Sequence, residues 1–163
     1  ELKSVKPDPF PGIMVGFSNC RPTSLGSVEI KSASPVDPPS IQPNFLATEH
    51  DTTEMLEGAR FIRELSVTPQ LATVIAEEIK PGLSIQLGAA MEADMSSRSY
   101  SVFHPCCTAR MGAGGVVDEK LRVRGVDGLR VIDASVFPNI IAGNINGPTM
   151  MVGWKGAALV MNS

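Results

Sequence analysis

His104 is the residue of this sequence best suited to acid–base chemistry. It lies in the largely apolar segment Val102–Thr108 and precedes Pro105, which biases the backbone of His104 towards an extended conformation. An imidazole changes its charge near neutral pH, so it can take up or supply a proton at a reacting group. The residues alone leave two interpretations open, a general base or a histidine satisfied inside the core.

Further polar groups with a chemical meaning lie near the end of the chain. Asp133 directly follows an expected strand over residues 129–132, where a carboxylate either meets hydroxyl groups of a ligand or caps a helix. A segment rich in Gly and Asn, residues 139–148, then opens onto a helix expected over residues 149–160, with Pro148 near its start. The N-terminal end of such a helix suits a phosphate or the negative charge of a reduced ring system.

The composition excludes several other functions. Fourteen Lys and Arg against seventeen Asp and Glu leave a formal charge of -3, so a nucleic acid is not an expected partner. No apolar run approaches the ~20 residues of a membrane span. The odd count of cysteines (Cys20, Cys106 and Cys107) and the lack of metal-ligand spacing disfavour a disulfide framework and a metal site, and favour a cytoplasmic location. His50 stands in a charged stretch and is expected at the surface.

Apolar spacing predicts the elements of the first half of the chain. The alternation in residues 27–31 predicts a strand in a sheet with one buried face. Residues 51–65 predict a helix with Asp51 and Glu54 as a loose capping box. A second helix is expected over residues 68–80, with its acidic pair Glu77 and Glu78 on the solvated face.

The second half gives weaker signals for regular structure. Met91 and Met95 are spaced for a helical turn or two that fills the core. Residues 121–124 and 129–132 predict two short strands around a tight turn. Because Val131 and Ile132 are adjacent and both apolar, the second of these strands is expected to be buried on both faces.

The stretch HPCCTARMG (residues 104–112) resembles a motif of the glucose-methanol-choline (GMC) flavoprotein oxidoreductases, whose usual pattern is roughly HPxGTxRMG. The likeness continues through GVVDEKLRVRGVDGLRVIDASVFP (115–138) and GNINGPTMMVGWKGA (143–157), and it includes RPTSLGSVEIKSASPVDPPSIQPNFL (21–46) upstream. The resemblance implies an α/β fold class, as an α+β fragment. This fragment would combine the sheet and helices of the substrate domain with the last strand and helix of the FAD-binding domain.

The resemblance also implies an activity and a set of roles. Family members oxidise an alcohol by transferring hydride to FAD while a side chain removes the hydroxyl proton. His104 matches the active-site histidine, and Asn144 matches a partner position that orients the substrate oxygen. Five residues match the contacts to FAD: Asp133, Ala134, Ile145, Asn146 and Pro148. Phe103 either lines the substrate pocket or packs in the core.

The likeness covers only the C-terminal third or less of the length of a family member. Residues 1–111 are therefore expected to belong to the substrate-binding (cap) domain, and residues 112–163 to return to the FAD-binding domain. No G-x-G-x-x-G motif occurs, so an N-terminal FAD-binding part is an expected partner, as a separate chain or a missing segment, beside a small alcohol substrate. Two alternatives remain open. One is a hydroxynitrile lyase with a non-redox FAD, which Asn144 disfavours, and the other is a non-catalytic binding module.

Cys106 and Cys107 depart from the family pattern, which has a small apolar residue and Gly at these positions. A Cβ at position 107 is expected to exclude a positive φ and to reshape the loop behind His104. Buried thiols are expected here rather than a strained disulfide between neighbours.

Overall fold

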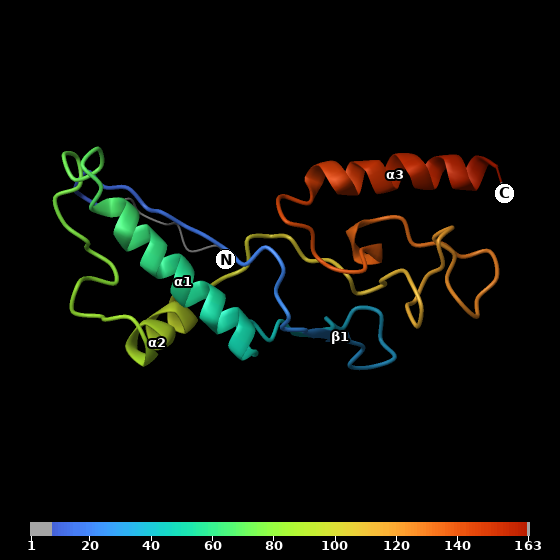
Figure 1. The fold of residues 1–163 in the computed structure, drawn as a ribbon. Helices are drawn as coiled ribbons and strands as arrows, with labels where there is room; N and C mark the ends of the chain where they lie inside the picture. Colours follow the sequence, from blue (N-terminus) through green and yellow to red (C-terminus); the bar gives the residue numbers. More distant parts are fainter. Residues whose placement is uncertain (1–7, 163) are drawn as a thin grey trace.

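The computed structural model describes residues 8–162, which form two lobes joined by extended segments (Figure 1). One lobe contains the helices α1 (Glu49–Ser66) and α2 (Ala89–Arg98). The other contains the short 3-10 helix η1 (Ala134–Val136), the loops before it and the helix α3 (Asn146–Met161). This mixture of helices and strands agrees with the predicted α/β, or α+β, fold class. Within residues 8–162, no helix is long and apolar enough to cross a membrane.

The predicted division between residues 111 and 112 stays a prediction. Residues 1–7 of its first part and residue 163 of its second lie outside the described residues. In Figure 1 the helices α1 and α2 lie on one side of the molecule and α3 on the other.

Helix α1 begins earlier than expected, because Thr48 and not Asp51 is its N-cap. The hydroxyl of Thr48 accepts a hydrogen bond from the N–H of Asp51 at 3.3 Å, so it satisfies a donor of the first turn. The carboxylate of Asp51 instead accepts hydrogen bonds from Thr23 and Ser24. The prediction of Asp51 as the cap was wrong because a second acceptor stands three residues upstream.

Residues 68–80 do not form the predicted second helix. Backbone hydrogen bonds make turns from Thr68 to Ile75 and do not continue. Residues 73–75 are all β-branched, which lowers helix propensity. Most of the predicted apolar stripe is exposed in the part of the chain that the structure describes, with Ile79 at 50%.

Two methionines of α2 and an ion pair between α1 and the segment after it contribute to the lobe of α1 and α2. Met91 and Met95 of α2 are only 2% and 7% exposed, which confirms their predicted place in the core. Arg63, in the last turn of α1, donates two hydrogen bonds to the carboxylate of Glu78, at 2.9 and 2.7 Å. Glu78 was predicted on a solvated helix face, and this half-buried ion pair corrects that prediction.

The strands β1 (Ser27–Glu29) and β2 (Ser40–Gln42) pair antiparallel as an isolated ribbon. The alternating pattern therefore correctly predicted a strand. The predicted burial of one face was wrong, because Val28 and Ile30 are 52% and 90% exposed. A two-stranded ribbon has no buried face until another layer packs on it, and in the described chain none does.

The core of the second lobe lies between α3 and the loops before η1. It is made of six buried residues: Val117, Leu121, Val136, Phe137, Ile145 and Val152. The predicted strands 121–124 and 129–132 are here only extended segments with isolated bridges, although Val123 N–H does bond Leu129 C=O across the expected tight turn. Leu121, with φ of 62°, interrupts the first of them.

Helix α3 packs closely against the end of the second extended segment. A Cβ at Gly156 would lie 2.2 Å from Ile132 Cγ2, so only Gly permits this approach. Val131 and Ile132 are half-buried, not buried on both faces as predicted, because α3 covers only one side. The opposite face of α3 is apolar and exposed, with Trp154 at 81%.

Candidate active site

His104 and Asn144 are in direct contact. The Nε2 atom of His104 lies 2.9 Å from Oδ1 of Asn144, although the residues are 40 positions apart. The His104 ring is half-buried and Asn144 is exposed. The structure thus brings together the two residues that the sequence had singled out for the chemistry.

The amide of Asn144 can serve both protonation states of His104. As an acceptor, Oδ1 pairs with an Nε2 that carries a proton; after a half-turn of the amide, its NH₂ group pairs with an Nε2 that carries none. Proton uptake by the imidazole therefore does not leave this contact unsatisfied. A substrate hydroxyl group that approaches Nε2 of His104 would take the place of the Asn144 amide in this hydrogen bond.

A backbone ladder positions the segment that follows His104. Every second N–H group from residue 107 to residue 111 donates a hydrogen bond to a carbonyl of residues 134–136. The three bonds are Cys107 to Ala134 at 3.4 Å, Ala109 to Ser135 at 2.9 Å and Met111 to Val136 at 2.9 Å. This ladder places the His104 segment beside Asp133 and η1. Sequence reasoning missed it, because backbone donors and acceptors carry no residue-type signal.

Asn144 stands just before α3, and the neighbouring backbone is well fixed. Ile145 is 8% exposed, and its carbonyl accepts hydrogen bonds from the N–H and the hydroxyl of Thr149, at 2.9 and 2.7 Å. Asn146 and Pro148 lie in the first turn of α3, so the prediction of Pro148 near a helix start is confirmed. The first N–H groups of a helix lack intrahelical partners, and no side chain caps those of α3.

Asp133, Ala134 and Phe103 lie around the same ladder. Asp133 is exposed, and its Oδ1 accepts a hydrogen bond from Ser135 N–H at 2.8 Å, so it caps η1. Ala134 is half-buried in η1. Phe103 is 79% exposed with φ of 61°. Of its two predicted places, packing in the core is therefore wrong for the described chain.

Cys107 adopts the conformation that its Cβ was expected to forbid. Its φ is 72°, in the left-handed region that favours Gly. The prediction failed because the ladder at Cys107 N–H and the packing of Cys106 and Cys107 against the core hold the chain in this turn. Both cysteines carry thiols and no disulfide, as expected, and both are half-buried.

The backbone strain at Cys107 predicts a difference between two substitutions. We expect Cys107→Gly to be more stable than Cys107→Ala by about 1 kcal/mol, because Gly adopts a positive φ at no steric cost. Both variants lack the same thiol, so the difference isolates the backbone effect. Urea unfolding of the two proteins measures it, and equal midpoints would contradict the strain.

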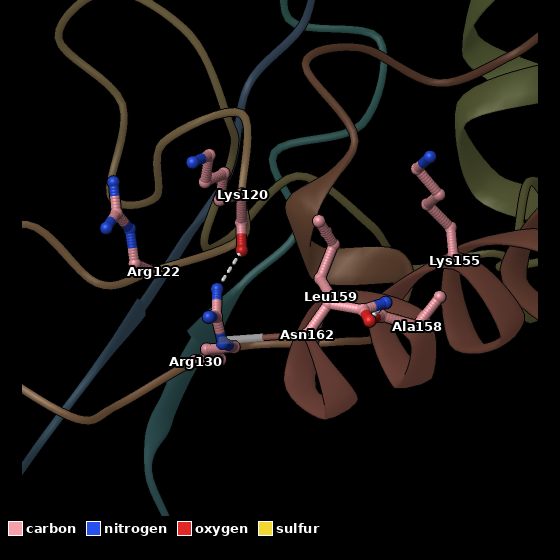
Figure 2. Close-up of a pocket in the computed structure, with 7 residues that line it drawn as sticks. All are labelled: Lys120, Arg122, Arg130, Lys155, Ala158, Leu159 and Asn162. Atoms are coloured by element: carbon pink, nitrogen blue, oxygen red, sulfur yellow. Dashed lines mark hydrogen bonds between the residues drawn. The ribbon is translucent and has the colours of Figure 1, made fainter.

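The structure also has a pocket of about 390 Å³ beside the C-terminal half of α3. Figure 2 shows its cationic lining of Lys120, Arg122, Arg130 and Lys155, completed by Ala158, Leu159 and Asn162. Arg130 donates a hydrogen bond to the carbonyl of Lys120 across it. None of the predicted site residues lines this pocket.

Comparison with known proteins identifies the class. Residues 22–153 match the family model described as GMC oxidoreductase. The chain is 40% identical over 155 residues to an oxygen-dependent choline dehydrogenase of Vibrio vulnificus (93% of this chain, 28% of the relative). It is 39% identical over 152 residues to an alcohol dehydrogenase [acceptor] of Pseudomonas putida (92% and 28%). A solved FAD-dependent oxidoreductase from Chaetomium thermophilum superposes with a TM-score of 0.79 at 29% identity, over 88% of this chain and 25% of that one.

The chain belongs to the GMC oxidoreductase family, whose members are FAD-dependent flavoproteins. It spans about a quarter of the length of the relatives that it matches. The donors at the start of α3 and the exposed carboxylate of Asp133 are the kind of groups that the carbonyls and hydroxyls of a flavin cofactor require. The residues present therefore fit FAD.

Proposed function

We propose that this chain supplies the general base of an FAD-dependent enzyme that oxidises a primary alcohol to an aldehyde, together with the amide that orients the alcohol beside that base. The observation that carries the proposal is the 2.9 Å contact between His104 Nε2 and Asn144 Oδ1, made by two segments distant in sequence. Family membership supports the reaction class, and the choline and alcohol dehydrogenases among the relatives support an alcohol as substrate.

His104 acts as the general base. It accepts the hydroxyl proton of the alcohol at Nε2 as the carbinol hydrogen leaves, which avoids a build-up of charge on the substrate oxygen. Asn144 orients that oxygen through its amide and then accepts a hydrogen bond from the protonated ring. An Asn side chain takes up no proton at neutral pH, so the base role falls to His104.

The cofactor side of the site is formed by the ladder and the start of α3. FAD, when bound, supplies the hydride acceptor. Asp133 and Ala134 would meet its ribityl and diphosphate region, and Ile145, Asn146 and Pro148 its ring system. The positive end of α3 favours negative charge on a bound ring. Phe103, exposed and one residue before the base, would line the substrate side.

The partner in this arrangement is an N-terminal FAD-binding part. The exposed apolar face of α3, with Trp154 at its centre, offers it a surface of the right chemistry. In this proposal residues 1–111 belong to the cap domain and residues 112–163 to the FAD-binding domain.

An anaerobic half-reaction tests the proposal. The holoenzyme mixed with a primary alcohol such as choline or benzyl alcohol, without oxygen, should lose its yellow oxidised-flavin absorbance as the aldehyde forms. A hydroxynitrile lyase would cleave a cyanohydrin and leave that absorbance unchanged. Cyanohydrin cleavage without bleaching by any alcohol tested would overturn the redox function, and a holoenzyme inert to both substrate classes would overturn catalysis.

A further inference from the structure

Two adjacent thiols follow His104 and are not used by the mechanism above. The sulfurs of Cys106 and Cys107 lie 3.1 Å apart, and the S–H of Cys107 points to the sulfur of Cys106. Both residues are half-buried against the core of the second lobe. Cys20, the third cysteine, is exposed and stands apart from them in the sequence.

The backbone at Cys107 accounts for this proximity. Consecutive side chains of an extended segment point to opposite sides, which would separate the two sulfurs. The positive φ of Cys107 turns the chain so that both sulfurs face each other. A strained backbone that holds two reactive groups in contact is a feature that often marks a functional site.

We propose that Cys106 and Cys107 form an oxidation site for small hydroperoxides, closing to an intrachain disulfide. The sulfur of Cys106 attacks the peroxide, so that an S–O bond forms, the O–O bond breaks and an alcohol or water leaves. The sulfur of Cys107 then attacks Cys106, the S–S bond forms and the S–O bond breaks. The two thiol protons leave with the two oxygen atoms of the peroxide. Two thiols are oxidised by two electrons, and one hydroperoxide is reduced.

The environment of Cys107 sets the order of these steps. Burial first, and then its contact with Cys106, raises the pKa of the Cys107 thiol to about 12. Cys107 therefore keeps its proton and donates it towards Cys106, which leaves Cys106 as the attacking sulfur. In the second step, this proton passes to the hydroxyl group that leaves Cys106, so the S–H bond of Cys107 breaks as the S–S bond forms.

This chemistry is independent of the proposed alcohol oxidation, and its test reads the sulfur atoms directly. The holoenzyme is treated with hydrogen peroxide and its intact mass is measured, and a second portion is then alkylated and analysed by peptide mapping. We expect a loss of about two mass units, a disulfide within the peptide that contains residues 106–107, and recovery of both thiols with dithiothreitol. Prior treatment with phenylarsine oxide, which binds paired thiols, should prevent the loss.

The three cysteines provide matched controls. Cys20→Ser should form the disulfide as the unmodified protein does. Cys107→Ser should gain oxygen at Cys106 and lose no mass, and Cys106→Ser, which lacks the attacking sulfur, should neither gain oxygen nor lose mass. Oxygen addition to the unmodified protein without a disulfide, a disulfide through Cys20, or unreactive thiols at residues 106 and 107 would each overturn the proposal. The result for the unmodified protein is decisive even where a variant fails to fold.

Discussion

Replacing His104 with Gln should lower kcat/KM for alcohol oxidation by about 10²–10⁴-fold, the range that general acid–base catalysis contributes. Gln can keep a hydrogen bond to Asn144 and much of the volume of the ring, but it has no nitrogen that takes up the hydroxyl proton. The rate of flavin reduction in an anaerobic stopped-flow experiment measures the effect. Substrate affinity should change far less, because the lost interaction belongs to proton transfer.

The other histidine provides the control. His50 is exposed on α1, 3.5 Å from Glu54, so His50→Gln should leave the rate within about twofold, as expected for a surface substitution. Asn144→Ala should fall between the two, with a loss of about 10- to 100-fold, because the base remains while the substrate oxygen loses an orienting partner. A rate for His104→Gln near that of His50→Gln would contradict the base assignment.

The candidate site was predictable as a set of residues but not as a geometry. The apolar segment around His104 favoured a core histidine and left a base as the alternative, and only the likeness to a family joined His104 to Asn144. Asp133 shows the same limit, because its predicted duty as a helix cap is observed at η1 and its predicted contact with a ligand remains a proposal. The ladder that joins residues 107–111 to residues 134–136 is made of backbone atoms, so no pattern of side chains predicts it.

The fold was predictable from apolar spacing only where a second element packs on the apolar face. The spacing of Met91 and Met95 was sufficient, because α2 packs that face against α1. Residues 68–80 have a similar apolar spacing, but most of that stripe has no partner in the described chain and the helix is absent. The ribbon of β1 and β2 has the right alternation and no layer to cover it. Periodicity thus indicates which face would be buried, and burial needs a second element.

Asp51→Ala should lower the free energy of unfolding by about 3 kcal/mol, the range for a buried charged acceptor whose removal leaves donors unpaired. The Asp51 residue is 1% exposed and accepts hydrogen bonds from the N–H groups of Thr23 and Ser24, at 2.8 and 2.9 Å, and from the hydroxyl of Thr23 at 3.0 Å. These bonds fasten the chain before β1 to the first turn of α1. Urea unfolding followed by circular dichroism measures the loss.

An exposed carboxylate on the same helix serves as the comparison. Glu57→Ala should change the free energy of unfolding by no more than about 0.5 kcal/mol, as expected at the surface. A loss for Asp51→Ala as small as that for Glu57→Ala would mean that the Thr23–Ser24 segment is not held by this carboxylate.

The pH dependence of the Asp51 effect has a definite sign. Burial alone would raise the pKa of Asp51, but the hydrogen bonds from Ser24 and Thr23 outweigh it and hold the pKa well below its usual range. A carboxyl whose pKa is lower in the folded than in the unfolded state stabilises the fold above its unfolded pKa, about 3.9. That contribution decreases as the pH falls from about 4 towards the folded pKa. The stability difference between the unmodified protein and Asp51→Ala should therefore be constant above about pH 5 and shrink below about pH 4. A difference that grows on acidification would show that the protonated form of Asp51 is the one that the fold prefers.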